Sequence, residues 1–390
     1  MKAKRLMILA GSVCLALMLV VPLVAGCGPA APEGSAEAEL EAKLVAEKAK
    51  VADLEDEVAD LEDEIAGLKA PGEVHKWQPA MYSAAGIIWD TLCWMADYME
   101  KESNGRLQVN PSAPGAVCPV DEQLDAVATG ITEAMMPWPG YFKGKVPIAA
   151  IQCYCLNATA SEAEMRYLYD FYEDGRITEL FREEYAKYGD VYLASNVYSM
   201  GLDIMNSNVP LYGIDDIEGV SFRASGMLAE ALAQLGAGTC WFPVDEVYTS
   251  LATGVVDAVI TSNVVECQEL GLHEITKYWI KKPPMSGPGC SAFIVNGTVW
   301  KALPDDLKAI VEFACQAGSG RNLLEMETKA EKSWTFVENY GIEVVEWSAE
   351  DCARWAEVFR PFWDESSDDP ACAEMYSIVE KYMIAEGYWK

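Results

Sequence analysis

The chain has few histidines and few basic residues for its length of 390. It contains 2 His, and its 29 Lys and Arg are outnumbered by 61 Asp and Glu, which gives a formal net charge of −32. Neither His75 nor His273 has a second ligand at metal-binding spacing, so no metal site is predicted. Because binding to phosphate groups requires a basic face, the charge argues against a nucleic-acid-binding role.

The sequence also lacks the short motifs of common enzyme classes. The patterns G-x-S-x-G, H-E-x-x-H, G-x-x-x-x-G-K-[ST] and G-x-G-x-x-G are all absent. A hydrolase needs a nucleophile and a base within reach of each other, and no such pair is recognisable. We therefore predict a protein that is not an enzyme and uses no cofactor, with an exported hydrolase as an alternative.

Long apolar runs are absent except at the N-terminus. There, a basic start precedes an apolar stretch over residues 6–25, and small residues lead to Cys27. This order is typical of a bacterial lipoprotein signal, with cleavage before Cys27 and a lipid on its thiol. A membrane-spanning helix is the alternative. We predict a signal peptide over 1–26, a lipid-anchored tether over 27–38, and an extracytoplasmic location on the cell membrane, in the periplasm or at the cell surface.

Cysteine pairs with C-x-x-C spacing are missing as well. Ten cysteines remain beyond Cys14 and Cys27, and most stand singly in apolar stretches, as Cys93, Cys240 and Cys315 do. An even number of cysteines in an exported chain permits disulfides, whereas apolar surroundings favour buried free thiols. The sequence leaves both states open.

Residues 39–69 carry a heptad pattern that is typical of a coiled-coil stalk. The steps between its positions alternate between four and three, which places them on one seam. The a positions are Leu44, Val51, Val58 and Ile65, and the d positions are Leu40, Glu47, Leu54, Leu61 and Leu68. Such residues favour a parallel homodimer through residues 40–68. A single solvated helix is one alternative, and a scaffold whose coiled coil is the functional part is another.

The remaining residues, 73–390, are too many for one hydrophobic core, so two lobes are expected. Strand and helix patterns alternate along them, which is typical of α/β lobes. Among these elements we predict a strand over 74–83, an amphipathic helix over 87–102 and a long helix without proline over 305–338.

The segment 219–262 places Arg223 at the end of a predicted strand and just before a predicted helix, with Ser225 as the helix N-cap. A guanidinium can donate two parallel hydrogen bonds to a carboxylate, and a helix N-terminus adds further donors. A structural ion pair would also explain a cation at this place. Arg223 is our first candidate for binding an anionic ligand.

Aromatic residues are abundant, with 12 Trp and 18 Tyr in the chain. Ligand-binding clefts are often lined by aromatic side chains and a few polar groups. Trp138 and Tyr141 follow the end of a predicted strand, where ligands bind in open α/β sheets. We take Trp138, Tyr141 and Tyr82 as candidate ligand-binding residues, and packing inside a lobe is the alternative for the first two.

Several short motifs follow one another between about residues 73 and 370. They are Gly105–Leu107, Tyr141–Lys145, Gly219–Arg223, Glu246–Ala258, Gly271–Tyr278 and Leu303–Leu307. With these motifs, the body resembles the DctP-type solute-binding proteins of tripartite ATP-independent periplasmic (TRAP) transporters. The stretches Lys143–Lys145 and Gly271–Tyr278 are most similar to members that bind 2-oxo acids or lactate.

The resemblance implies a two-lobed periplasmic-binding-protein-like α/β fold with a long connecting helix. Lobe I is expected over about 73–200 and 284–330, and lobe II over about 201–283 and 331–366. The lobes would close on a small organic acid, with Arg223 paired to its carboxylate. The resemblance also implies delivery of the ligand to a TRAP membrane permease driven by an ion gradient, and a membrane sensor is the alternative partner.

Two positions depart from the oxo-acid-binding members. Where the resemblance implies a Glu-Trp pair that helps bind a metal, this chain has Ile260 and Thr261. Thr261, Ser262 and Asn263 can hydrogen-bond a ligand instead. Asp203 stands near the place where other members carry a second arginine, and an acid there would repel a second carboxylate. We predict a monocarboxylate such as a 2-oxo or 2-hydroxy acid, or a ligand with a separate polar or cationic group, rather than a dicarboxylate.

Overall fold

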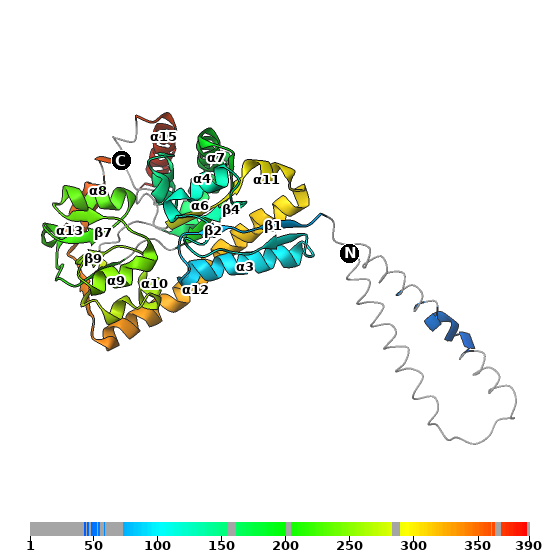
Figure 1. Ribbon diagram of the computed structural model, residues 1–390, viewed down its shortest axis with the longest axis horizontal. Coiled ribbons are helices and arrows are strands. Elements are labelled where there is room, and N and C mark those ends of the chain that lie inside the picture. Colours follow the sequence, from blue (N-terminus) through cyan, green and yellow to red (C-terminus); the bar gives the residue numbers. More distant parts are fainter. Residues whose placement is uncertain are drawn as a thin grey trace, which may run out of the picture. The chain divides into compact units, whose positions relative to one another are not determined.

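The structure is a computed structural model (Figure 1). It describes residues 43, 45–46, 48–52, 54 and 58, and then 73–153, 161–199, 204–282, 289–359, 361–362 and 368–387. Residues 1–72 and 73–390 form two separate compact units. The few described positions between 43 and 58 are helical. The predicted signal peptide, Cys27, the tether, most of the predicted coiled coil and Asp203 lie outside the described residues.

The unit over 73–390 contains two lobes, each built around its own β-sheet. We call lobe I the part around a four-stranded sheet with the order β2-β4-β11-β5. β2 runs parallel to β4, and β11 runs antiparallel to both β4 and β5. These strands are β2 (Ala80–Met81), β4 (Ala134–Met136), β5 (Val191–Ser199) and β11 (Gly289–Asn296).

Helices cover both faces of the lobe I sheet. Successive residues of a strand point to opposite faces, so neighbouring residues of one strand pack against different helices. Ala194 and Phe293 pack in one apolar cluster with helices α3 and α12, whereas Leu193 and Ile294 pack in another with α6 and α7. The helices of lobe I and the C-terminal α15 are α3 (Gly86–Glu102), α4 (Gln123–Ala128), α5 (Ala149–Gln152), α6 (Glu162–Asp170), α7 (Arg176–Tyr188), α11 (Gly297–Ala302) and α15 (Pro370–Ala385).

The predicted strand over 74–83 is two short strands rather than one. β1 (His75–Trp77) pairs with β3 (Leu107–Val109), and β2 pairs with β4 instead. Pro79 lies between β1 and β2 and has no N–H to donate, so one hydrogen bond is missing there, although Ser112 N–H donates to the Pro79 carbonyl and Ala80 still bridges to Ser112. β2 thus lies between β4 and the segment that follows β3, and Tyr82 follows its last residue.

Lobe II is built around a six-stranded sheet with the order β12-β10-β6-β9-β7-β8. The neighbouring strands β8, β7 and β9 run parallel to one another, so their C-terminal ends meet at one edge of the sheet. The strands are β6 (Met205–Ser207), β7 (Ser221–Arg223), β8 (Gly238–Cys240), β9 (Ala258–Val259), β10 (Tyr278–Lys282) and β12 (Glu343–Glu346), and the helices are α8 (Gly226–Gln234), α9 (Val247–Ala252), α10 (Val264–Glu269) and α13 (Ala349–Val358).

The chain passes between the two lobes more than once, and a long helix runs along both. The chain crosses after β5 and again after β10. Helix α12 (Asp305–Tyr340) runs along both lobes (Figure 1). A Cβ atom at Gly318 would lie 2.8 Å from Met95 Cγ, so this glycine allows α12 to pack closely on α3. The predicted two-lobed α/β fold with a long connecting helix is confirmed.

Several cysteines that the sequence left open are free thiols in the structure. They are Cys93, Cys118, Cys240, Cys315 and Cys372. Burial raises the pKa of the Cys315 thiol, and it raises the pKa of Cys372 to about 12. Both thiols therefore stay protonated at neutral pH and act as small apolar core residues.

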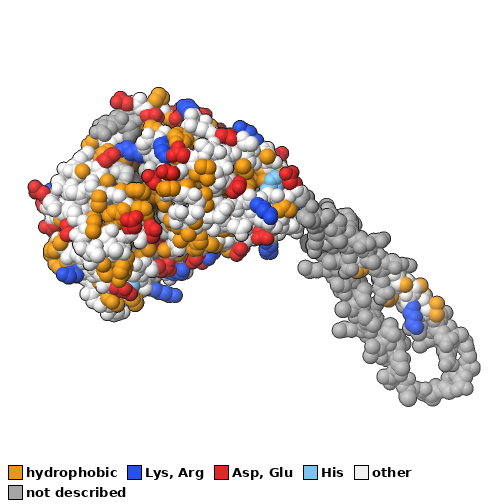
Figure 2. Space-filling view, in the orientation of Figure 1, with side chains coloured by type: hydrophobic (Ala, Val, Ile, Leu, Met, Phe, Trp, Pro, Cys, Tyr) orange, Lys and Arg blue, Asp and Glu red, His pale blue; other side chains and the backbone are white. Residues whose placement is uncertain are grey.

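The surface of the body carries mixed charge. Figure 2 shows acidic side chains over the visible face, with Lys and Arg side chains scattered among them. Among the described residues, no helix has both the length and the apolar character that crossing a membrane requires.

Candidate functional site

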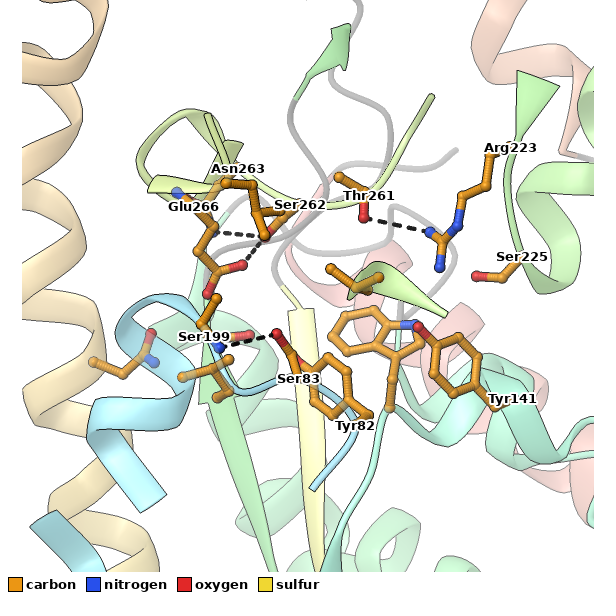
Figure 3. Close-up of a pocket in the computed structure, with 16 residues that line it drawn as sticks. Tyr82, Ser83, Tyr141, Ser199, Arg223, Ser225, Thr261, Ser262, Asn263 and Glu266 are labelled. Carbon is orange, nitrogen blue, oxygen red and sulfur yellow. Dashed lines mark hydrogen bonds between the residues drawn. The ribbon is translucent and has the colours of Figure 1, made fainter. Parts of the chain in front are cut away.

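A pocket lies where strand ends and helices of both lobes meet (Figure 3). It contains about 660 Å³ of space, counting the part open to solvent. All of the residues that the sequence analysis selected for ligand binding line this one pocket. They are Arg223, Thr261, Ser262, Asn263, Trp138, Tyr141 and Tyr82. Their direct contact with a ligand stays a prediction.

The local fold explains why three of these residues meet. Arg223 is the last residue of β7, and it pairs with Val259 of β9, a parallel neighbour. The chain leaves β9 at the same edge and continues through Thr261 and Ser262. Parallel strands therefore bring Arg223 beside residues almost forty positions further along, at the sheet edge where ligands bind in α/β proteins.

Arg223 is almost completely buried, with 2% of its surface exposed. The Phe242 carbonyl oxygen accepts hydrogen bonds from Nε at 3.1 Å and from Nη2 at 2.9 Å. The Ile260 carbonyl oxygen accepts from Nη1 at 3.3 Å, and the Thr261 hydroxyl oxygen lies 3.4 Å from the same nitrogen. A guanidinium has five N–H groups, and these four bonds use Nε, both N–H groups of Nη1 and one of Nη2. One N–H of Nη2 therefore has no acceptor among the described residues, and a carboxylate that bound it in parallel with Nη1 would replace the long bond to Thr261.

Arg223 forms no ion pair with any described residue, unlike several surface arginines. Arg176 pairs with Glu183 and Glu374, for example, and is about one third exposed. The groups around Arg223 are neutral: backbone carbonyls, a hydroxyl and the ring of Phe242, whose centroid lies 6.0 Å from Cζ. A buried charge without a counter-ion is unfavourable, so this site is suited to an anion from outside the chain. The structural ion pair considered from the sequence does not occur among the described residues.

Ser225 occupies the N-cap position of α8, as predicted, but its hydroxyl makes no capping hydrogen bond. It lines the pocket beside Arg223 instead (Figure 3). Asn263 has the capping role that Ser225 lacks: its Oδ1 accepts from the backbone N–H groups of Val265 and Glu266 at the start of α10, at 3.1 Å each. The Asn263 amide oxygen is therefore occupied within the protein, which leaves Nδ2 as the group it could offer a ligand.

Aromatic rings from lobe I form one wall of the pocket. The Tyr82 ring centroid lies 6.3 Å from that of Trp138 and 6.2 Å from that of Tyr141. Tyr141 also meets Trp241 of lobe II edge to face at 5.3 Å. Trp138 is 6% exposed and belongs to the lobe core, so it both packs the interior and faces the pocket. The two interpretations of this residue from the sequence are thus compatible.

Sequence reasoning missed several polar residues of the pocket, among them Ser83, Ser199, Glu266 and Asn322. Glu266 and Asn322 lie on helices α10 and α12, so the face they present depends on how those helices pack. One signal for Glu266 was present in the sequence. It stands three residues after Asn263, and an acid in that position is common in the first turn of a capped helix.

The residues present do not fit a metal ion bound next to the ligand carboxylate. Ile260 is apolar and buried in the core, and the hydroxyl of Thr261 lies beside Arg223. The described residues contain no group of three or more His, Cys, Asp or Glu side chains arranged to hold a metal. We therefore derive no step through a metal.

Two α/β lobes with a lined pocket between them define the class of two-lobed solute-binding proteins. Residues 84–369 match the family described as bacterial extracellular solute-binding protein, family 7 (DctP). The chain belongs to this family, and it is a solute-binding protein of the TRAP type.

Curated relatives match most of the chain at low identity. A monocarboxylate 2-oxoacid-binding periplasmic protein of Nostoc sp. is 23% identical over 285 residues, which cover 72% of this chain and 76% of the relative. The C4-dicarboxylate-binding periplasmic protein DctP of Rhodobacter capsulatus is 27% identical over 276 residues, which cover 69% of this chain and 79% of the relative.

Solved structures confirm the fold. A TRAP transporter solute-binding protein from Bordetella bronchiseptica, crystallised with copurified calcium and picolinate, has a TM-score of 0.74 and 19% sequence identity. The match covers 82% of this chain and 94% of that chain.

Proposed function

We propose that this protein captures a small monocarboxylate outside the cytoplasm and delivers it to a TRAP-type membrane permease. The observation that carries the proposal is Arg223, a buried cation that faces the pocket without a carboxylate partner among the described residues. A ligand carboxylate would complete its hydrogen bonds and neutralise its charge. The aromatic wall opposite would exclude water, which strengthens the ion pair. The proposed role is binding and handover rather than catalysis.

A monocarboxylate is favoured over a dicarboxylate because the pocket offers one cation. Among the described residues that line it, Arg223 is the only basic side chain, and Glu266 is an acid. A second carboxylate would meet the Glu266 carboxylate rather than a second basic residue of the described lining, and like charges at short range repel. The Thr261 hydroxyl beside Arg223 could hydrogen-bond an oxo or hydroxy group next to the carboxylate, which favours a 2-oxo or 2-hydroxy acid. The 2-oxoacid-binding relative of Nostoc sp. supports the same class.

A thermal-shift screen of the purified protein tests this function. Each probe is a short monocarboxylate with an oxo, hydroxy or amino group, and its matched control is the uncharged amide of the same acid. We expect at least one acid to raise the Tm, because a ligand that binds only the folded state stabilises it, and its amide to have no effect. Equal shifts by acid and amide, no shift with any acid, or turnover of a probe would contradict the proposal.

The N-terminal part of the proposal concerns attachment to the membrane. We propose that Cys27 carries a lipid and that residues 40–68 pair two copies in parallel. Radiolabelled palmitate should enter the protein, and Cys27→Ala should lose the label and leave the membrane fraction. Light scattering should give the mass of a dimer that Val51→Lys with Val58→Lys converts to a monomer, because both residues lie at a positions of the heptads.

A further inference from the structure

The proposed function uses only one of the two charged side chains that line the pocket. Glu266, in the first turn of α10, lines it together with Arg223. Figure 3 shows Glu266 on the same side as Ser83 and Ser199, whereas Arg223 lies on the other side with Ser225. The two charged groups do not form an ion pair with each other, since Arg223 has none among the described residues.

Thr261 and Ser262 are consecutive in the chain, and each places its hydroxyl group beside one of the two charged side chains. The Thr261 hydroxyl oxygen lies 3.4 Å from Arg223 Nη1, and the Ser262 hydroxyl hydrogen-bonds the Glu266 carboxylate. The chain thus places one hydroxyl at each charge and holds the charges apart. A ligand in the space between them would meet a cation at one end and an anion at the other.

The neighbouring helices suit a negative charge at this end. Glu266 follows the N-cap Asn263 of α10. Its side chain also packs on Gly86 at the start of the 17-residue α3, where an added Cβ would lie 2.5 Å from Glu266 Cγ. Helix N-termini stabilise anions. The N-cap residue of α3 is Ala85, whose methyl side chain supplies neither a negative charge nor a capping hydrogen bond. The glycine therefore allows the carboxylate to approach the start of α3.

A second acceptor belongs to the pocket lining beside α3. Asn322 of α12 is 2% exposed, and its Nδ2 donates to the Thr91 hydroxyl at 3.3 Å. Its Oδ1 is buried and has no hydrogen-bond partner among the described residues. Such an acceptor is unfavourable unless a donor reaches it, and both Asn322 and Glu266 line the pocket beside α3.

We propose that the pocket is bipolar and selects a zwitterion, with the carboxylate at Arg223 and a cationic nitrogen at Glu266 and Asn322. The nitrogen donates N–H groups to the two acceptors, or, if fully alkylated, meets the carboxylate by charge alone. Within the monocarboxylates of the proposed function, the ligand class is then one that also carries an amino group, and an oxo or hydroxy group beside Thr261 remains compatible with it. This inference rests on the proposed function and narrows it.

Isothermal titration calorimetry on the purified full chain tests the inference with matched probes. The members of each pair share a carbon chain and a carboxylate, and one carries an amino group where the other carries a hydroxyl: glycine and glycolate, 3-aminopropionate and 3-hydroxypropionate, 4-aminobutyrate and 4-hydroxybutyrate. Because a hydrogen bond to a charged group contributes more than one to a neutral group, we expect the amino member of at least one pair to bind about 10-fold more tightly.

Glu266→Gln keeps the size of the side chain and removes its charge. In this variant the preference for the amino member should disappear, while the affinity for the hydroxy member should stay within about 2-fold, since a neutral group gains little from the charge. Glu266→Asp should retain the preference. Glu269→Gln is the matched control, because it neutralises an acid of the same helix that pairs with Lys329 outside the pocket. It should change neither affinity.

Three results would overturn the inference and leave the proposed function standing. If the hydroxy member binds as tightly as the amino member in all three pairs, the pocket does not select a cationic nitrogen. This measurement uses the parent protein and does not depend on whether Glu266→Gln folds. An equal loss for both members in Glu266→Gln would give Glu266 a structural role. A need for added calcium or sodium that this variant abolishes would make Glu266 a metal ligand. If no probe binds, or if Arg223→Ala binds every probe unchanged, the proposed function fails as well.

Discussion

The two sides of the pocket differ in chemistry. Both charged residues of the described lining, Arg223 and Glu266, come from lobe II, whereas its aromatic residues come from lobe I. The charged side sits at the ends of parallel strands and the first turn of a helix, where backbone dipoles add to its field. The aromatic side offers shape and exclusion of water. This division indicates that lobe II determines which charges are recognised and that lobe I determines how tightly the ligand is enclosed.

The largest effect should come from the charged side. We expect Arg223→Ala to weaken binding of any carboxylate ligand by on the order of 100-fold or more, because loss of one member of a desolvated charge pair leaves the other without a partner. Arg223→Lys should recover little of this, since an ammonium lacks the planar pair of donors. Calorimetry gives both values.

The control for this prediction is Arg354→Ala, which removes an exposed arginine that pairs with Asp215 on the surface of lobe II. It should leave affinity unchanged. Circular dichroism should show that Arg223→Ala remains folded without ligand, because the substitution also removes the cost of burying the charge. Unchanged affinity in Arg223→Ala would mean that the charged side does not recognise the carboxylate.

An intermediate effect should come from the aromatic side. Tyr141→Ala removes a ring that meets Tyr82 within lobe I and Trp241 across the pocket mouth. We expect about a 10-fold loss of affinity from lost apolar contact, with no change in the ranking of ligands by charge. Tyr167→Ala removes an exposed ring that packs on Tyr172 and Tyr382 away from the pocket, so this variant is the control and should bind normally. If Tyr141→Ala changed the order in which ligands of different charge bind, lobe I would also take part in charge recognition, which would contradict the proposed division of roles between the lobes.

The same division explains what the sequence could predict. Arg223, Thr261 and Ser262 were predictable, because they follow buried strand patterns and the ends of parallel strands meet at one edge. Tyr82 reached the pocket for a reason that the pattern did not contain, the pairing of the two-residue strand β2 with β4. For Glu266 the sequence offered only the capping signal after Asn263, and for Asn322 it offered none, because residues on amphipathic helices face the pocket only through the packing of α10 and α12 on α3.

A smaller effect should come from a contact that joins the two sides. Lys143 follows Tyr141 in lobe I, and its Nζ lies 2.5 Å from a carboxylate oxygen of Glu230 on α8 of lobe II. Both side chains are more than a third exposed, so the pair contributes about 0.2–1 kcal/mol. We expect Lys143→Ala to speed ligand release by roughly 2-fold to 5-fold in stopped-flow tryptophan fluorescence, with a smaller difference at high salt.

Lys145→Ala is the matched control for this contact. Lys145 belongs to the same loop but pairs with Asp125 of α4, within lobe I. Its removal should leave the release rate unchanged, because no contact between the lobes is lost. If both variants speed release equally, the loop acts through its own order rather than through the pair with Glu230.

The smallest effect concerns the stability of lobe I alone. Hydrogen bonds from Lys145 and then from Tyr188 hold the pKa of the Asp125 carboxyl below its ordinary value of 3.8. Because the folded state binds this proton less readily than the unfolded state, Asp125 contributes stability above that value and loses it as the pH falls through the lower folded pKa. Asp125 is about half exposed, at 48%, so the contribution should be only about 0.3 kcal/mol.

Urea unfolding at pH 7 and at pH 3 measures this contribution. Asp125→Asn should lower the free energy of unfolding at pH 7 and should show a smaller loss on acidification than the parent protein. The affinity of Asp125→Asn for its ligand at pH 7 should be unchanged, since neither Asp125 nor Lys145 lines the pocket around Arg223. A loss of affinity in this variant would show that the order of the lobe I loop, and not only the aromatic wall, determines how tightly the ligand is enclosed.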